Sequence, residues 1–342
     1  MFRIRLSAAD LEAIGGLVGE LRRSYASVED PRFLATATTH AQELPRGLRH
    51  GLNEFRLREP DAVCVIGGYP IDDERIGPTP AHWKDCVGRT TTPEEDFYFF
   101  LCASLLGDPI GWATQQEGRL MHDVFPIKEH VREQLGSGSE ELLTWHTEDA
   151  FHPLRTDYVG LMCLRNPDGV ETTYASVDDV ELPPEVAEVM RRERFPIRPD
   201  LSHRPGVSGR PDADDEETRR LLERSYDWIA GLEADPAPIA VLFGHPDQPY
   251  LRLDPYFMDP PGDAEEAAAL EATVAAIDAA IGGYALRPGE IIFLDNYRAV
   301  HGRKPFTARF DGTDRWLRRL NISRDLRKSR GSRLSADSRV IY

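Results

Sequence analysis

Two side chains that could act together stand two positions apart, a histidine at 146 and a glutamate at 148. The segment 142–146 has the composition of a strand, and side chains at i and i+2 project from the same face of a strand. An imidazole and a carboxylate on one face can therefore reach a single metal ion. An H-x-E pair also arises often by chance, so it is weak evidence when it stands alone.

A candidate third ligand is His301, in the apolar run 298–302 that follows a predicted strand at 290–294. Two imidazoles and one carboxylate on one face of an ion leave other positions open, which is the arrangement of non-haem Fe(II) oxygenases. The alternative is that His301 is an ordinary histidine of the core.

Arg315 is a candidate for binding a cosubstrate. An oxygenase of this kind needs an electron donor, and 2-oxoglutarate supplies two electrons by decarboxylation while its keto acid end chelates iron. Its distal carboxylate needs a cation, for which the planar guanidinium suits better than lysine. Arg315 stands 14 residues after His301, at the start of a predicted strand at 316–322. If that strand returns beside the His301 strand, Arg315 lies near the iron; otherwise it is an exposed structural arginine.

Three blocks of sequence resemble a known family: LLTWHTEDAFH at 142–152, DNYRAVHGRKPF at 295–306 and DGTDRWL at 311–317. They are similar to the clavaminate-synthase-like branch of Fe(II)/2-oxoglutarate oxygenases. The similarity is greatest to bacterial free-amino-acid hydroxylases, such as the arginine 3-hydroxylase of viomycin biosynthesis and the asparagine oxygenases of peptide antibiotic pathways. It extends from about residue 107 to about residue 330.

The resemblance implies a set of metal and cosubstrate residues. It makes His146, Glu148 and His301 the Fe(II) ligands, with O2 as the oxidant, and Arg315 the partner of the distal carboxylate of 2-oxoglutarate. Thr172, 24 residues after Glu148, matches a family threonine that also touches this carboxylate. Its neighbour Thr173 is the fallback, since alternation along a strand turns only one of the two inward.

The resemblance also implies substrate contacts. Arg319 matches the arginine that holds the amino acid α-carboxylate, and Gln115 matches a position that binds the α-amino group; Glu148 is counted among the substrate-binding residues as well. Asp254 matches an aspartate that pairs with the guanidinium in the arginine enzymes, and a buried carboxylate there would select a cationic substrate. Where a second acid is expected two residues on, this chain has Tyr256, which leaves lysine or a cyclic guanidino acid as alternatives.

The elements that must position these residues follow a two-part pattern. Residues 1–106 are predicted to be mostly helical, and 107–330 to form a jelly-roll core, interrupted by a helix at 264–281 and a candidate lid at 201–217 that is rich in Gly and Pro. Short strands without alternating helices favour an antiparallel sandwich over a doubly wound parallel sheet. We therefore expect residues 1–342 to form one domain, mainly β with flanking helices, with the double-stranded β-helix fold. The predicted strands of the core are 119–125, 142–146, 158–164, 171–177, 239–243, 250–253, 290–294 and 316–322.

Charge and composition exclude several classes of protein. The net charge of −17 argues against nucleic acid as the main partner, because an acidic protein repels a phosphate backbone. No apolar run is long enough to span a bilayer and the N-terminus lacks a signal peptide, so we expect no membrane partner and a cytoplasmic location. The 4 cysteines form no C-x-x-C pair. One segment, 298–330, is basic, with eleven Lys or Arg against three Asp.

Together these features predict hydroxylation, at C3, of a free cationic L-amino acid in a secondary-metabolite pathway such as antibiotic biosynthesis. Arginine or an arginine-like residue is the expected substrate. The open alternatives are C4 hydroxylation or desaturation at the same iron site, lysine or asparagine as substrate, and, from another class, a zinc-binding jelly-roll protein without oxygenase activity. The sequence does not indicate an oligomeric state.

Overall fold

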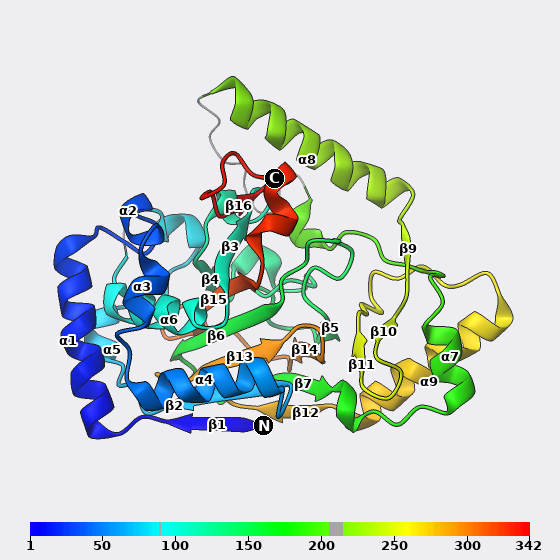
Figure 1. Ribbon diagram of the computed structural model, residues 1–342, viewed down its shortest axis with the longest axis horizontal. Helices are drawn as coiled ribbons and strands as arrows, with labels where there is room; N and C mark the ends of the chain where they lie inside the picture. Colours follow the sequence, from blue (N-terminus) through cyan, green and yellow to red (C-terminus); the bar gives the residue numbers. More distant parts are fainter. Residues whose placement is uncertain (89, 205–214) are drawn as a thin grey trace.

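The computed structural model describes residues 1–88, 90–204 and 215–342 and combines helices with two principal β-sheets (Figure 1). The larger sheet has the strand order β1-β2-β13-β6-β15-β3-β16, with β4 also paired to β15. Its strands are β1 Phe2–Arg5, β2 Val63–Gly67, β3 Asp108–Trp112, β4 His122–Val124, β6 Tyr158–Arg165, β13 Ile291–Asp295, β15 Trp316–Ser323 and β16 Val340–Ile341.

The smaller sheet has the order β12-β7-β14-β5 and is antiparallel throughout. Its strands are β5 Leu143–His146, β7 Thr172–Ser176, β12 Gly282–Tyr284 and β14 Ala299–Arg303. Two short antiparallel pairs lie outside these sheets: β8 Phe195–Pro196 with β9 Pro238–Ile239, and β10 Leu242–Gly244 with β11 Pro249–Leu251.

Helices of the N-terminal region cover the outer face of the larger sheet (Figure 1). The first of them begins as its sequence predicts, with the Ser7 side chain capping α1 in a capping box with Asp10. The most buried is α6, whose run from Phe97 to Ala103 is almost fully removed from solvent. The helices of this region are α1 Ala8–Ser24, α2 Pro31–Leu34, α3 Ala37–Ala41, α4 Arg46–Arg58, α5 Asp73–Ile76 and α6 Pro93–Ser104.

Three further helices follow in the chain: α7 Pro184–Met190, α8 Glu216–Ala234 and α9 Ala264–Ala280. The apolar sides of α7 and α9 pack against each other and against the smaller sheet, whereas α8 lies along the outside of the molecule (Figure 1). The 3₁₀-helices are η1 Trp83–Cys86, η2 Gln116–Gly118, η3 Lys128–His130, η4 Val177–Asp179, η5 Leu201–His203 and η6 Leu326–Ser332.

An apolar cluster fills the space between the two sheets. It joins Val159 and Leu161 of β6 and Leu317 of β15 to Ala299 of β14. Their neighbours Tyr158 and Met162 belong to the cluster under the N-terminal helices, so β6 is buried on both faces. That double burial explains why its sequence is an unbroken apolar run.

The chain is thus a mixed helix-and-sheet protein, and the expectation of a mainly β chain holds only in part. Strand β14 was expected only as an apolar run, and β3, α7 and α8 were not expected at all. The candidate lid at 201–217 begins with η5 and ends in the first turn of α8; its residues 205–214 lie outside the described part of the chain.

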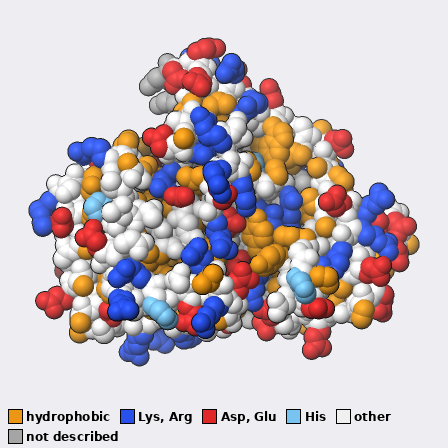
Figure 2. Space-filling model, viewed as in Figure 1, with side chains coloured by type: hydrophobic (Ala, Val, Ile, Leu, Met, Phe, Trp, Pro, Cys, Tyr) orange, Lys and Arg blue, Asp and Glu red, His pale blue; other side chains and the backbone are white. Residues whose placement is uncertain are grey.

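The basic segment 298–330 divides in two. Arg315 and Arg318 are buried, whereas Arg327, Lys328 and Arg330 are exposed. Lys and Arg side chains gather on the surface over the C-terminal segment around η6 (Figure 2). In the described ranges, no helix is both long and apolar enough to cross a membrane.

Candidate active site

The two candidate histidine ligands face each other across a pair of strands. His301 on β14 lies directly opposite His146 on β5 in the antiparallel register, and the two ring centroids are 4.8 Å apart. Strand pairing thus fixes two imidazoles side by side without help from any loop.

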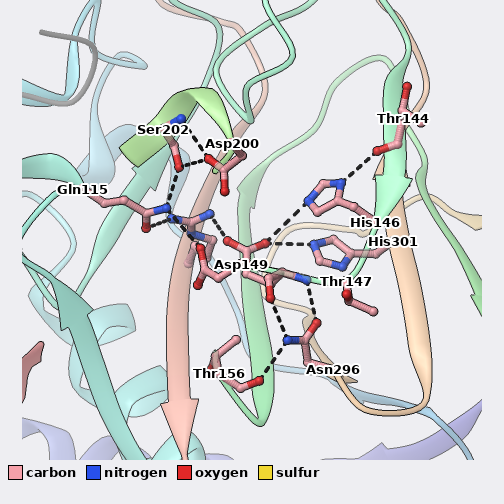
Figure 3. Close-up of polar contacts among 12 residues, drawn as sticks. Gln115, Thr144, His146, Thr147, Asp149, Thr156, Asp200, Ser202, Asn296 and His301 are labelled. Carbon is pink, nitrogen blue, oxygen red and sulfur yellow. Dashed lines mark hydrogen bonds and ion pairs between the residues drawn. The ribbon is translucent and has the colours of Figure 1, made fainter. Parts of the chain in front are cut away.

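Glu148 completes the cluster from beyond the end of β5. Its Oε2 lies 3.8 Å from His146 Nε2 and 3.2 Å from His301 Nε2, and one atom from each residue lies within 4.8 Å of the others (Figure 3). The expectation that His146 and Glu148 share one face of a strand is wrong in its detail. The strand ends at His146, so the turn that follows it, and not strand alternation, brings Glu148 to the site.

The Nε2 atom of each ring faces Glu148. His146 Nδ1 donates to the carbonyl oxygen of Thr144 at 2.8 Å, which leaves Nε2 facing Glu148. Burial alone would lower the pKa of this imidazole, but the hydrogen bond to Glu148 and the charges of Asp254 and Glu148 raise it to about 9. His301 Nδ1 is buried and has no partner in the described chain. Two imidazole nitrogens and a carboxylate oxygen are the donors that Fe(II) takes in a facial set, so the residues present fit this metal.

Charge around Glu148 keeps it in the form that binds metals. Burial alone would raise the pKa of this carboxyl, but the charge of Arg319 and hydrogen bonds from His146 and His301 hold it well below its usual range. Arg319 donates to Glu148 Oε1 and to Gln115 Oε1, the latter at 3.0 Å. Burial, the largest influence on His301, lowers the pKa of that imidazole, which favours the neutral ring that a metal requires.

Arg315 reaches the same pocket from the opposite sheet. It directly precedes β15 of the larger sheet, and β15 pairs with β3, β4 and β6 and not with β14. The expectation of a strand returning beside His301 is therefore wrong. Arg315 nevertheless lines the pocket with His146 and His301, because the two sheets face each other.

The surroundings of Arg315 leave its charge uncompensated. Its guanidinium is buried, its Nη2 donates to Thr172 Oγ1 at 3.3 Å, and its Nε has no partner. No carboxylate pairs with it within residues 1–88, 90–204 and 215–342. Burial lowers its pKa to about 10. Thr172, and not the fallback Thr173, lines the pocket. A buried cation beside a hydroxyl fits the distal carboxylate of 2-oxoglutarate.

Gln115 lies in a polar network beside the metal cluster. Its amide nitrogen donates to Ser202 Oγ at 2.6 Å and to Asp149 Oδ1 at 3.4 Å (Figure 3). Asp149 also accepts from Trp112 Nε1 at 2.6 Å and pairs with His203 at 2.9 Å. The side chains that accept from the Gln115 amide nitrogen therefore come both from the loop after Glu148 and from η5.

Asp254 contributes a second uncompensated charge. It is buried on the pocket wall and pairs with no cation in the part of the chain that the structure describes. Burial raises its pKa to about 6, helped by the charge of Asp200 and opposed by that of His146. Tyr256 and Phe257 line the pocket beside it.

Several polar residues of this site were not predicted from the sequence. Asp149 is buried at the centre of the network. Ser202 and His203 belonged to the candidate lid at 201–217, Asp200 directly precedes it, and Asn296 stood unremarked in the 295–306 block. The one feature of the sequence that could have drawn attention to Asn296 is its place within the 295–306 block, which resembles the family.

A family comparison decides the class of this fold and site. The model described as "Taurine catabolism dioxygenase TauD, TfdA family" matches residues 101–321. The chain belongs to the TauD/TfdA family. It is accordingly an enzyme of the non-haem iron, 2-oxoglutarate-dependent dioxygenase class, with the mixed helix-and-sheet fold of that family. The zinc-protein alternative is thereby excluded.

Similarity to individual TauD/TfdA proteins extends over the whole chain. It is 53% identical to the enduracididine beta-hydroxylase of Streptomyces hygroscopicus and 44% identical to the L-ornithine/L-arginine 3-hydroxylase of Catenulispora acidiphila, in each case over 100% of both chains. A crystal structure of the non-haem iron oxygenase OrfP with Fe, succinate and (3S)-hydroxy-L-Arg superposes with a TM-score of 0.93 at 41% identity, again over 100% of both chains.

Proposed function

We propose that this protein hydroxylates C3 of free L-arginine, or of an arginine-like amino acid, with Fe(II), 2-oxoglutarate and O2. The observation that carries the proposal is one pocket that holds three metal donors and two buried charges. One charge is the Arg315 cation, which has no carboxylate partner, and the other is the Asp254 carboxylate, which has no cation partner, in the described chain. The charges of Arg315 and Asp254 each match one end of a ligand, whereas Arg303, which also lines the pocket, donates to backbone carbonyls. The named activities of the relatives, both at the β or 3 position, support the carbon and the substrate class.

In this proposal His146, Glu148 and His301 hold the iron, and Arg315 with Thr172 binds the distal carboxylate of 2-oxoglutarate. Bound iron, with O2 and 2-oxoglutarate, supplies the oxidant that inserts one oxygen atom into a C–H bond and yields succinate and CO2. The protein's part is to hold the target carbon near the metal and to exclude water. The two facing sheets would form the double-stranded β-helix of such enzymes.

Substrate binding in this proposal uses both ends of the amino acid. Arg319 and Gln115 take the α-carboxylate and the α-amino group, with Glu148 adjacent, and Asp254 pairs with the guanidinium. In the structure Arg319 donates to both Glu148 and Gln115, so these three side chains form one hydrogen-bonded group. A free amino acid presents both termini to that group at once.

A second candidate substrate is the cyclic guanidino amino acid enduracididine. Tyr256 lines the pocket two residues after Asp254, where a second acid is expected for arginine, and the relative at 53% identity is named for this substrate. The face of an aromatic ring can contact a guanidinium, whether cyclic or extended.

The experiment that tests the proposal is aerobic incubation of the Fe(II)-reconstituted protein with 2-oxoglutarate and a panel of free amino acids. The panel is arginine, enduracididine, ornithine, lysine and asparagine, and succinate and product mass are read together. We expect a +16 product, placed at C3 by fragmentation, with a guanidino substrate. A −2 product would show desaturation, and oxidation of asparagine alone would overturn the substrate assignment. A cytoplasmic location, a role in antibiotic biosynthesis and the absence of nucleic-acid and membrane partners remain predictions.

A further inference from the structure

The side chain of Asn296 holds the backbone of Glu148 from both sides. Its Oδ1 accepts the Glu148 N–H at 2.7 Å, and its Nδ2 donates to the carbonyl oxygens of Glu148 at 3.0 Å and of Thr156 at 2.9 Å (Figure 3). The amide is 1% exposed. All the conventional hydrogen-bonding capacity of its NH2 group is used by these two carbonyls.

Within the residues that the structure describes, only Asn296 bonds to the peptide groups of Glu148. The register of β5 with β14 runs as far as the His146–His301 pair, and Thr147 N–H donates to the Leu253 carbonyl at 2.8 Å. Beyond that point, in the described chain, no backbone group bonds to the N–H or the carbonyl of Glu148. The Asn296 side chain therefore holds the backbone of Glu148 in place, as pairing with β14 holds the backbone of His146.

The residue after Glu148 makes this support necessary. Asp149 has φ of 50°, in the left-handed region that side chains with a Cβ rarely adopt. Such a conformation persists only when its surroundings over-determine it. Asp149 is held from its side chain by Trp112 and His203, and Asn296 fixes the peptide on the other side of the bend.

Asn296 also connects Glu148 to the other iron-ligand strand. It lies in the turn between β13 and β14, where its own N–H donates to the Asp157 carbonyl at 3.0 Å. Strand β14 begins three residues later at Ala299 and carries His301. The turn between β13 and β14 thus positions both residues. It leads into β14, which carries His301, and its Asn296 side chain binds the backbone of Glu148.

We propose that Asn296 is a positioning residue that sets the place of the Glu148 carboxylate relative to His301 and thereby the affinity of the metal site. The inference rests on the proposed role of His146, Glu148 and His301 as metal ligands. Loss of the amide would let the Glu148 turn relax while both histidines stay in register on their strands. Hydrogen-bonded partners that orient metal ligands typically change metal affinity about 10- to 100-fold when removed.

The test compares Asn296→Ala with a matched control, Asn166→Ala, in the full-length apoprotein. Asn166 makes the same kinds of bonds: it accepts the Val170 N–H at 2.9 Å and donates to the carbonyls of Val170 at 3.1 Å and of Leu286 at 3.0 Å. It lies in the turn after β6 and does not line the site pocket. Both variants lose the same set of bonds, so a general loss of stability should affect both.

The readout is the dissociation constant of Mn(II), measured from the electron paramagnetic resonance signal of the free ion without turnover. We expect about 10- to 100-fold weaker binding in Asn296→Ala and less than about a twofold change in Asn166→Ala. Reconstituted with Fe(II), the Asn296→Ala variant should also form more succinate per hydroxylated product than the wild type. Equal Mn(II) affinity in Asn296→Ala and wild type would overturn the inference.

A second variant covers the case in which Asn296→Ala does not fold. Asn296→Asp keeps the acceptor for the Glu148 N–H and loses both donor bonds. Its added negative charge would by itself tighten Mn(II) binding, so weaker binding than in wild type would support the inference and tighter binding would overturn it. If the wild type itself bound no Mn(II), the proposed metal site would be wrong. If the wild type and the Asn296 variants bound Mn(II) equally well, the metal site would stand and only the role of Asn296 would be wrong.

Discussion

Arg315 is a buried guanidinium with a hydroxyl, and no carboxylate, beside it in the described structure. If 2-oxoglutarate supplies the missing carboxylate, Arg315→Ala should raise the KM for 2-oxoglutarate at least about 30-fold, since removing one partner of a buried charge pair costs about 2 kcal/mol or more. Steady-state succinate formation measures this, with the substrate amino acid saturating.

Arg309 provides the control for Arg315. It is exposed and pairs with Asp168 at 2.6 Å on the surface, so Arg309→Ala should leave the KM for 2-oxoglutarate unchanged. A KM in Arg315→Ala equal to that of the wild type would remove Arg315 from the cosubstrate site.

Asp254 is the corresponding buried anion, and its expected effect depends on the charge of the substrate. Asp254→Asn should lower kcat/KM for arginine at least about 30-fold, for the same energetic reason. Citrulline is the neutral analogue in which a urea replaces the guanidinium. Its kcat/KM should fall little or rise in Asp254→Asn, because the variant no longer leaves a carboxylate unpaired when this substrate binds. Competition between the two substrates, read by product mass, measures the change in preference.

Asp247→Asn is the control for this charge test, because Asp247 is exposed and does not line the site pocket. It should leave the preference for arginine unaltered. An arginine-to-citrulline preference that is the same in Asp254→Asn as in wild type would disprove the assignment of Asp254.

Residue types at the site were largely readable from the sequence, whereas their mutual contacts were not. His146, Glu148 and His301 could be chosen because imidazole and carboxylate are specific metal donors and a family resemblance joined distant blocks. The backbone clamp of Asn296 could not be chosen, because an asparagine in a turn usually serves the turn itself. The long-range pairing of Asp149 with His203 depends on a fold that brings residues 54 apart together.

At the scale of single elements, β15 directs alternate side chains to the site pocket and to a buried network on its other face. Leu317 and Arg319 point into the pocket, whereas Arg318 points to the other face. There it donates to Asp96 Oδ1 and Oδ2 at 2.8 and 2.7 Å, and to Asp123. This buried network joins α6, β4 and β15.

Arg318→Met should therefore destabilise the apoprotein by about 3–5 kcal/mol, because it leaves carboxylates buried without their cation. Denaturant unfolding measures this change. Arg309→Met, which breaks a surface pair of similar geometry, should cost no more than about 1 kcal/mol. Equal losses in the two variants would contradict the structural role given to Arg318.

The same network predicts how stability depends on pH. Burial alone would raise the pKa of Asp123, but the cations of Arg318 and Arg119 bring it below the ordinary value of 3.8. The unfolded state then binds more protons than the folded state in this range, so the contribution is present above about pH 4 and is lost as the pH falls. Asp123→Asn should show a shallower loss of unfolding free energy between pH 5 and 3, and a slope equal to that of wild type would contradict this.

Elements with a strong local signal were predicted well and elements fixed by pairing were not. Helix α9 begins at Ala264 as expected, since Asp263 caps it with two backbone bonds. Strand β14 was seen only as an apolar run, because an element of 5 residues between two others has little periodicity to read. The expected pairing of the strand after Arg315 was wrong for a different reason, since strand order in a sheet depends on distant partners.

At the scale of the whole molecule, the site lies between two sheets that contribute opposite halves of it. His146, His301 and Thr172 come from the smaller sheet, and Arg315 and Arg319 from the larger. A metal with 2-oxoglutarate would therefore bridge the sheets.

Ligands that bridge the sheets should stabilise the whole fold. Mn(II) and 2-oxoglutarate, each near 100 times its dissociation constant, should each add about 2.7 kcal/mol to the free energy of unfolding, and EDTA should remove both contributions. Unfolding with each ligand alone and with both measures this. Stabilisation by 2-oxoglutarate that is as large without metal as with it would contradict a chelated cosubstrate.

The most direct test of the central claim is the fate of molecular oxygen. The Fe(II)-reconstituted protein is incubated with 2-oxoglutarate, arginine or enduracididine, and ¹⁸O2, and succinate is counted against product. The account predicts one succinate per product and an amino acid heavier by 18 mass units in place of 16, because one atom of O2 enters each. Product without ¹⁸O, or no succinate above background with either guanidino substrate, would contradict it.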